Sequence, residues 1–143
     1  MSLQALTALS PLDGRYAAKV EPLRAHFSEF GLIRNRIKVE IEWLKALAAN
    51  PGIAEVPAFS EDTLAELDLV ISGFAVSDAE AVKKIESVTN HDVKAVEYWL
   101  KERFKNNAEV MRVTEFIHFG CTSEDINNTS HALMLNDARS QIL

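Results

Sequence analysis

The segment from Thr114 to Asn128 holds one histidine, one thiol, three hydroxyls and three carboxylates. It lies where an apolar stretch gives way to a helical pattern, so these polar groups gather at a helix start. Thr122 or Ser123 is a suitable N-cap. Backbone N–H groups at a helix start are unpaired and point outward, which also makes the segment a candidate anion site. Local chemistry leaves both interpretations open: capping alone, or capping combined with anion binding.

A second polar break lies near the N-terminus, where Asp13 and Gly14 form a turn signal. Arg15 and Tyr16 follow it directly. The guanidinium group is a planar donor fork suited to phosphate or carboxylate, and the phenol adds one further hydrogen bond. The alternative is a surface turn whose arginine is simply solvated.

A third polar break, Thr89–Asp92, separates two helical patterns. Asn90 or Asp92 is expected to cap the helix that follows. His91 lies beside a carboxylate, which makes it a candidate for proton transfer or for hydrogen bonding to a ligand near neutral pH. A capped turn with an incidental histidine is the alternative.

Metal binding is not indicated. His118, Cys121 and His131 do not match the spacing of common zinc sites, and no second cysteine is present. No local feature of the sequence is of the kind that activates a cysteine nucleophile. We therefore interpret Cys121 as a small apolar side chain beneath the helix start.

Composition limits the class of protein. The chain has 143 residues, of which 48% are hydrophobic and 25% charged, and its net charge is -6. These values fit a globular domain with a packed core and argue against general nucleic-acid binding. The single cysteine suits the reducing cytoplasm. No apolar run approaches the length of a membrane span, and the N-terminus lacks the pattern of a secretory signal.

The elements that must position these polar groups are helices, because apolar residues recur every three or four positions through most of the chain. The predicted fold class is all-α. Expected helices cover about 28–49, begin after Ser60, begin at Ser77 with a capping box to Glu80, cover about 93–104, and run from about 124 onward. The apolar residues of the last helix are Ile126, Leu133, Leu135, Ala138 and Ile142, and Ile142 would expose apolar surface unless something covered it. Its pattern is still periodic at the end of the chain, which predicts a fragment of a longer protein.

Taken together, the three breaks resemble a known family. Ser10–Tyr16, Thr89–Tyr98 and Glu115–Asn128 are similar to the N-terminal part of the adenylosuccinate lyases of the bacterial purine-biosynthesis branch, within the fumarase/aspartase superfamily. The resemblance extends over essentially the whole chain. It implies that residues 1–120 form an N-terminal helical domain and that residues 121–143 begin a central helical-bundle domain.

The resemblance also implies an activity. Enzymes of this family eliminate fumarate from adenylosuccinate to give AMP, and from the succinyl-aminoimidazole-carboxamide ribotide of the same pathway. They need no metal and no organic cofactor. They are cytoplasmic homotetramers whose active sites are shared between subunits. The acid histidine and base serine of the family are expected beyond Leu143, so this chain alone would be inactive.

The resemblance assigns substrate binding to seven residues: Arg15, Tyr16, Asn90, His91, Asp92, Thr122 and Ser123. The first two would bind the phosphate, and the next three would line the pocket, with His91 supporting catalysis by orienting the substrate. The last two would hold a carboxylate of the succinyl group. His118 and Glu124 are expected close behind these side chains.

Two alternatives remain. One is a sister lyase such as argininosuccinate lyase, although Arg15 and Tyr16 favour a nucleotide phosphate. The other is a noncatalytic helical interaction module that binds a partner helix through the apolar end near Ile142.

Overall fold

The computed structural model describes residues 5–142, and within them every regular element is a helix, so the predicted all-α class is confirmed. In chain order the elements are η1 (Glu21–Leu23), α1 (Arg24–Phe27), α2 (Glu29–Ala49), α3 (Glu61–Ser72), α4 (Val76–Thr89), α5 (Asp92–Arg103), α6 (Ala108–Arg112), η2 (Thr114–Phe116) and α7 (Ser123–Ile142). None of the helices in this described part is long and apolar enough to cross a membrane.

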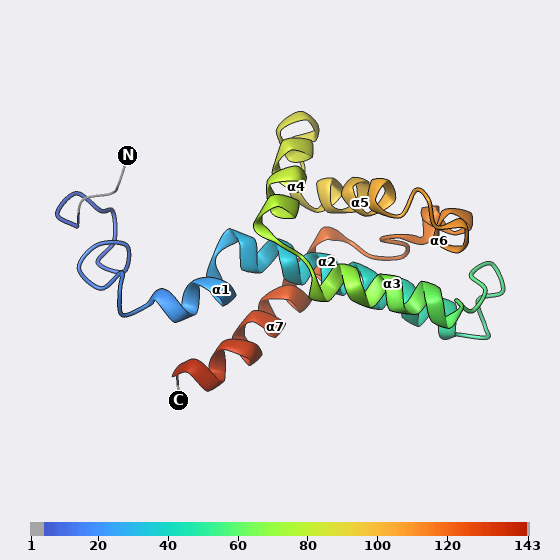
Figure 1. Cartoon of the computed structure of the whole chain (residues 1–143), viewed down its shortest axis with the longest axis horizontal. Coiled ribbons are helices and arrows are strands. Elements are labelled where there is room, and N and C mark those ends of the chain that lie inside the picture. Colours follow the sequence, from blue (N-terminus) through green and yellow to red (C-terminus); the bar gives the residue numbers. More distant parts are fainter. Residues whose placement is uncertain (1–4, 143) are drawn as a thin grey trace.

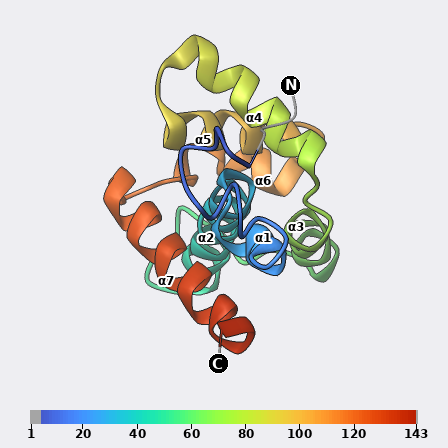
Figure 2. The same ribbon diagram turned by 90° about the vertical axis from the view of Figure 1, so that its left-hand side faces the viewer.

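Helix α2 is the centre of the fold. It runs through the middle of the molecule with α3 and α7 on either side and α4 and α5 above it (Figures 1 and 2). Its buried apolar residues follow the predicted helical spacing, and they include Ile33, Ile37, Ile41 and Leu44. One long helix therefore supplies the surface on which the remaining elements are placed.

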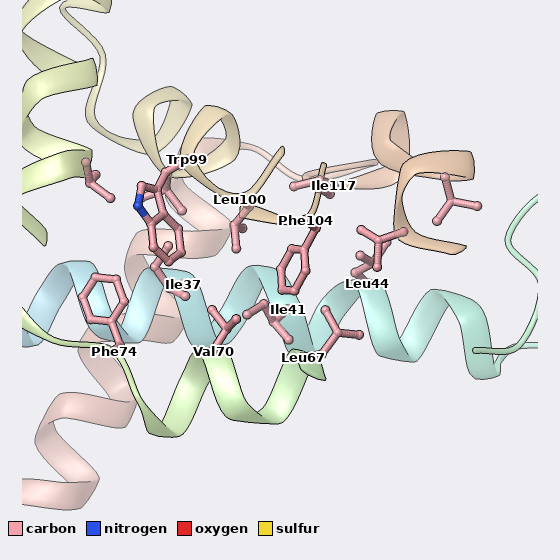
Figure 3. Packing of buried hydrophobic residues seen from close by; sticks show 14 of the residues in the cluster. Ile37, Ile41, Leu44, Leu67, Val70, Phe74, Trp99, Leu100, Phe104 and Ile117 are labelled. Carbon is pink, nitrogen blue, oxygen red and sulfur yellow. The ribbon is translucent and has the colours of Figure 1, made fainter. Parts of the chain in front are cut away.

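The main core lies between α2, α3 and α5. Figure 3 shows Leu100 and Phe104 approaching Ile37 and Ile41 of α2 from one side, with Leu67 of α3 on the other. All five side chains are essentially inaccessible to solvent. Each buried side chain of this size contributes about 1.5–3 kcal/mol to stability.

Four of the five predicted helix starts, those of α2, α3, α5 and α7, agree with the structure to within one residue, and the predicted capping box at the start of α4 is wrong. The hydroxyls of Ser28 and Ser60 cap α2 and α3, each accepting a backbone N–H at 3.2 Å. Helix α4 was expected to begin with Ser77 as its N-cap, but it is preceded by Ala75 instead. The Asp78 carboxylate accepts the Ala75 N–H at 2.9 Å, which fixes the start two residues earlier.

Helix α7 packs along α2 through residues spaced four apart, and these are Ile126, Ser130, Met134 and Ala138. Leu135 and Ile142 are 64% and 61% exposed, so the apolar end near Ile142 is uncovered in the described chain. Neither belongs to the row of buried residues spaced four apart, so both side chains project away from α2.

Candidate functional site

The break between α4 and α5 is built by three consecutive residues with different roles. Asn90 takes the left-handed conformation, with φ of 53°, and ends α4. His91 then caps α5, since its Nδ1 accepts the Lys94 N–H at 3.1 Å. The expectation that Asn90 or Asp92 caps α5 is therefore wrong. Asn90 is used in closing the preceding helix, and Asp92 already lies in the first turn.

Asp92 is held by two donors. Its Oδ1 accepts the Val93 N–H at 2.8 Å, and its Oδ2 accepts Nη2 of Arg36 at 2.6 Å. Burial alone would raise the pKa of Asp92, but the Val93 N–H and the Arg36 guanidinium together outweigh it and lower that pKa. Asp92 is thus a carboxylate at neutral pH, and it is tied to α2.

Arg36 also reaches α7. Its side chain is only 8% exposed, and its Nε donates to Oδ1 of Asn127 at 2.9 Å. One guanidinium group therefore connects the start of α5 with the second turn of α7, and so brings two of the three predicted breaks together. Sequence reasoning missed Arg36, although a charged residue next to the apolar stripe of a central helix was an available signal.

Some of the hydrogen-bond donors at the start of α7 are already bonded to a carboxylate of the same helix, that of Asp125. Thr122 directly precedes the helix, and Oδ2 of Asp125 accepts both its N–H at 2.7 Å and its hydroxyl at 2.9 Å. These two bonds lower the pKa of Asp125. The Ser123 hydroxyl, in contrast, makes no hydrogen bond to any other residue of the described chain. Ser123 and the unpaired N–H groups of this first turn are the donors available to an anion.

The loop before α7 is fastened to α2 at two points. Nδ1 of His118 lies 2.6 Å from Oε1 of the fully buried Glu40, and Nε1 of Trp43 donates to the Phe119 carbonyl at 2.8 Å. His118 and Gly120 have φ of 66° and 72°. This conformation is easily adopted by glycine, whereas it costs about 1–3 kcal/mol for another residue. The contact with Glu40 holds His118 in this left-handed conformation.

The charges around this loop suppress thiol ionisation. Burial raises the pKa of Cys121, and the negative charges of Glu40 and Asp125 raise it further. Cys121 is free and half-buried. This supports its interpretation as a small apolar side chain and not as a nucleophile.

The break near the N-terminus is a local turn, as predicted. The Gly14 N–H donates to the Ser10 carbonyl at 3.1 Å, and the Tyr16 N–H to the Pro11 carbonyl at 2.9 Å. The Arg15 guanidinium lies 5.4 Å from the centre of the Tyr16 ring. Figure 1 shows this segment at one end of the molecule, away from the starts of α5 and α7. Within the described chain it does not join the other two breaks.

A groove of about 630 Å³ runs between α2 and α7 on a largely apolar surface. Its lining residues are Lys38, Val39, Glu42, Trp43, Ala46, Gly120, Cys121, Asp125, Ile126, Thr129 and Leu133. None of the seven residues predicted to bind substrate is among them. In residues 5–142 no group of three or more histidine, cysteine or acidic side chains is arranged to hold a metal ion.

A protein-family model described as "Lyase" matches residues 14–143, so the chain belongs to this lyase family. Over all 143 residues it is 59% identical to the adenylosuccinate lyase of Haemophilus influenzae, 58% to that of Vibrio cholerae and 55% to that of Escherichia coli. The chain spans 31% of the length of each of these curated relatives.

Proposed function

We propose that the complete protein is an adenylosuccinate lyase. It would eliminate fumarate from adenylosuccinate to give AMP, and from the succinyl-aminoimidazole-carboxamide ribotide of purine biosynthesis. The observation that carries this proposal is the joining of the α5 and α7 starts through Arg36, in a chain that is 55–59% identical to adenylosuccinate lyases.

The start of α7 supplies the chemistry that the succinyl group requires. Elimination develops negative charge on a substrate carboxylate, and donors arranged in advance are worth several kcal/mol for such charge. We assign carboxylate binding to Ser123 and the first N–H groups of α7. Thr122 contributes from the same turn, where its donors now bind Asp125 and would have to exchange that partner for the ligand.

The start of α5 supplies the second wall of the pocket. His91 uses Nδ1 in capping, which leaves Nε2 for a hydrogen bond that orients the substrate. Asn90 and Asp92 line the same wall. Asp92 is already paired with Arg36, so its role is to fix the position of the helix start and not to accept a proton.

Arg15 and Tyr16 are proposed to bind the substrate phosphate. In the described chain their segment lies away from the α5 and α7 starts. We therefore assign them to a site completed by a neighbouring subunit of a homotetramer. The protein would act in the cytoplasm without metal or organic cofactor.

We further propose that residues 1–120 form the N-terminal helical domain and residues 121–143 the beginning of the central bundle. The acid histidine and base serine are assigned to the part of the relatives' length that this chain does not span. The 143-residue chain alone is then expected to be inactive.

The test is an assay of fumarate release from adenylosuccinate, with the complete protein and the 143-residue chain compared side by side. We expect turnover by the complete protein only. Thermal shifts with AMP, fumarate and arginine distinguish a sister lyase, since stabilisation by arginine but not by AMP would favour an argininosuccinate lyase. A complete protein that releases no fumarate from adenylosuccinate would refute the proposed function.

A further inference from the structure

Glu40 is an acidic side chain with no exposure to solvent, placed on the central helix. Its Oε1 lies 2.6 Å from Nδ1 of His118, while its Oε2 has no hydrogen-bond partner among the described residues. A buried carboxyl group with an unpaired oxygen costs free energy, and an apolar residue would fill the same place more cheaply. Packing therefore does not account for Glu40, and its contact with His118 is the feature to explain.

We propose that Glu40 is a positioning residue for the reaction: it orients His118 so that Nε2 of that ring donates a hydrogen bond to an anionic group of the substrate. The two ring nitrogens lie on opposite sides of the imidazole, so a ring held through Nδ1 directs Nε2 away from Glu40. His118 is 22% exposed through its side chain, and it lies four residues before Thr122. This inference rests on the proposed function and adds a donor to its carboxylate-binding turn.

Proton counting supports a donor at Nε2. When the pair carries no net charge, it is either a carboxylate with an imidazolium or a carboxylic acid with a neutral imidazole. Nε2 carries a hydrogen in both forms, since the acid donates to Nδ1 in the second. Removal of the shared proton would leave Nδ1–H bonded to the carboxylate, and Nε2 could then no longer donate.

The surroundings favour retention of that proton. Burial raises the pKa of Glu40, against the opposing effect of His118, and the nearby Glu97 carboxylate raises it further. Glu97 is itself held as a carboxylate by Lys94 at 2.6 Å and Lys101 at 3.1 Å. On the loop side, Asp125 carries the charge that faces His118, and Cys121 stays a thiol.

The test is a double-mutant cycle in the complete protein, with kcat/KM for fumarate release as the readout. Glu40→Leu removes the contact and keeps the site filled, so the protein should remain folded. His118→Asn removes the ring and retains a residue that tolerates the left-handed conformation. Each single variant is expected to lose about 10- to 100-fold, as for one hydrogen bond to a charged group. The double variant should lose no more than His118→Asn alone, because Glu40 acts through that ring.

Glu40→Gln is the conservative control, since its amide can donate to Nδ1 and keep Nε2 protonated. It should recover most of the activity lost in Glu40→Leu. It should also lack the alkaline decline of kcat/KM that we expect of the wild type when the pair loses its shared proton. Thermal unfolding of each variant separates these effects from a loss of fold.

Losses that multiply in the double variant, or full activity in Glu40→Leu, would overturn the inference while leaving the proposed function intact. A wild-type protein that releases no fumarate would instead refute the proposed function, and this inference with it.

Discussion

The starts of α5 and α7 and the N-terminal turn are all polar breaks, but they are held in different ways. Buried groups of α2 fix the first two: Arg36 bonds Asp92 and Asn127, and Glu40 contacts His118. The turn that carries Arg15 is held by backbone hydrogen bonds of its own and by an exposed ion pair between Asp13 and Arg24 at 3.9 Å, and the Arg15 guanidinium lies over the neighbouring Tyr16 ring.

This difference separates a fixed part of the candidate site from an adaptable part. Burying Arg36 costs desolvation free energy, which is offset only because its hydrogen bonds are well aligned. The surrounding core then determines where the α5 and α7 starts lie. Arg15 is exposed and stays hydrated, so it remains available to a ligand and to a neighbouring subunit. Variants in the two parts should therefore differ in whether stability changes along with activity.

The largest effect is expected for Arg36→Ala, which removes the connection between the fixed helix starts and leaves Asp92 unpaired. We expect a stability loss of about 2–4 kcal/mol and at least a hundredfold lower kcat/KM for fumarate release. Arg34→Ala is the matched control, because Arg34 is on the same helix and, among the residues the structure describes, donates only to the Ala25 carbonyl, at 3.1 Å. Urea unfolding and steady-state kinetics provide the readouts. Equal behaviour of the two variants would contradict the bridging role of Arg36.

Ser123→Ala should act on the reaction with little effect on the fold. Its hydroxyl makes no hydrogen bond within the described chain, so we expect a stability change below about 0.5 kcal/mol. Loss of a donor to the developing charge should lower kcat about 100-fold. Ser140→Ala, at the far end of α7, is the control and should keep full turnover. Unchanged kcat in Ser123→Ala would remove that hydroxyl from the site.

His91 tests whether one residue combines capping with substrate orientation. Asparagine is a good N-cap, so His91→Asn should keep stability while kcat falls about tenfold or more. His91→Ala should show the same fall in kcat and also lose about 1 kcal/mol of stability. Thermal unfolding and kinetics on both variants separate the two roles. Wild-type turnover in His91→Asn would leave capping as the only function of this residue.

The smallest effect should come from the adaptable turn. Arg15→Ala is expected to raise KM about tenfold through the lost phosphate contact, with stability unchanged within about 0.5 kcal/mol. Lys19→Ala is the control, since Lys19 lies at a similar distance, 5.8 Å, from the same Tyr16 ring. An increase in KM of the same size for both variants would indicate general charge and not a specific phosphate contact.

The sequence predicted the parts of the fold that depend on local spacing. The α2 stripe through Ile37 and Ile41, the helix start at Ser28 and the cap at Ser60 are local features, and the structure confirms them. The predicted start of α4 was wrong because the Asp78 carboxylate accepts the Ala75 N–H. Several nearby polar residues could have formed an equivalent cap, so the local sequence did not distinguish between them.

The bridge that forms the candidate site could not be predicted in the same way. Arg36 pairs with residues 56 and 91 positions further along the chain, and only tertiary packing determines such partners. The polar breaks themselves were recognisable, because hydroxyls and carboxylates at a helix start have local reasons to be there. Their relative placement depends on buried groups such as Arg36. In the sequence, Arg36 is only a charged residue beside an apolar stripe, which does not identify its partners.

The most direct test of this account is a crystal structure of the complete protein with AMP and fumarate bound. A fumarate carboxylate should lie within hydrogen-bond distance of Ser123 and the first N–H groups of α7, with the α5 start on the opposite wall and Arg36 still bonded to Asp92 and Asn127. Fumarate bound in the groove between α2 and α7, or away from both helix starts, would contradict it.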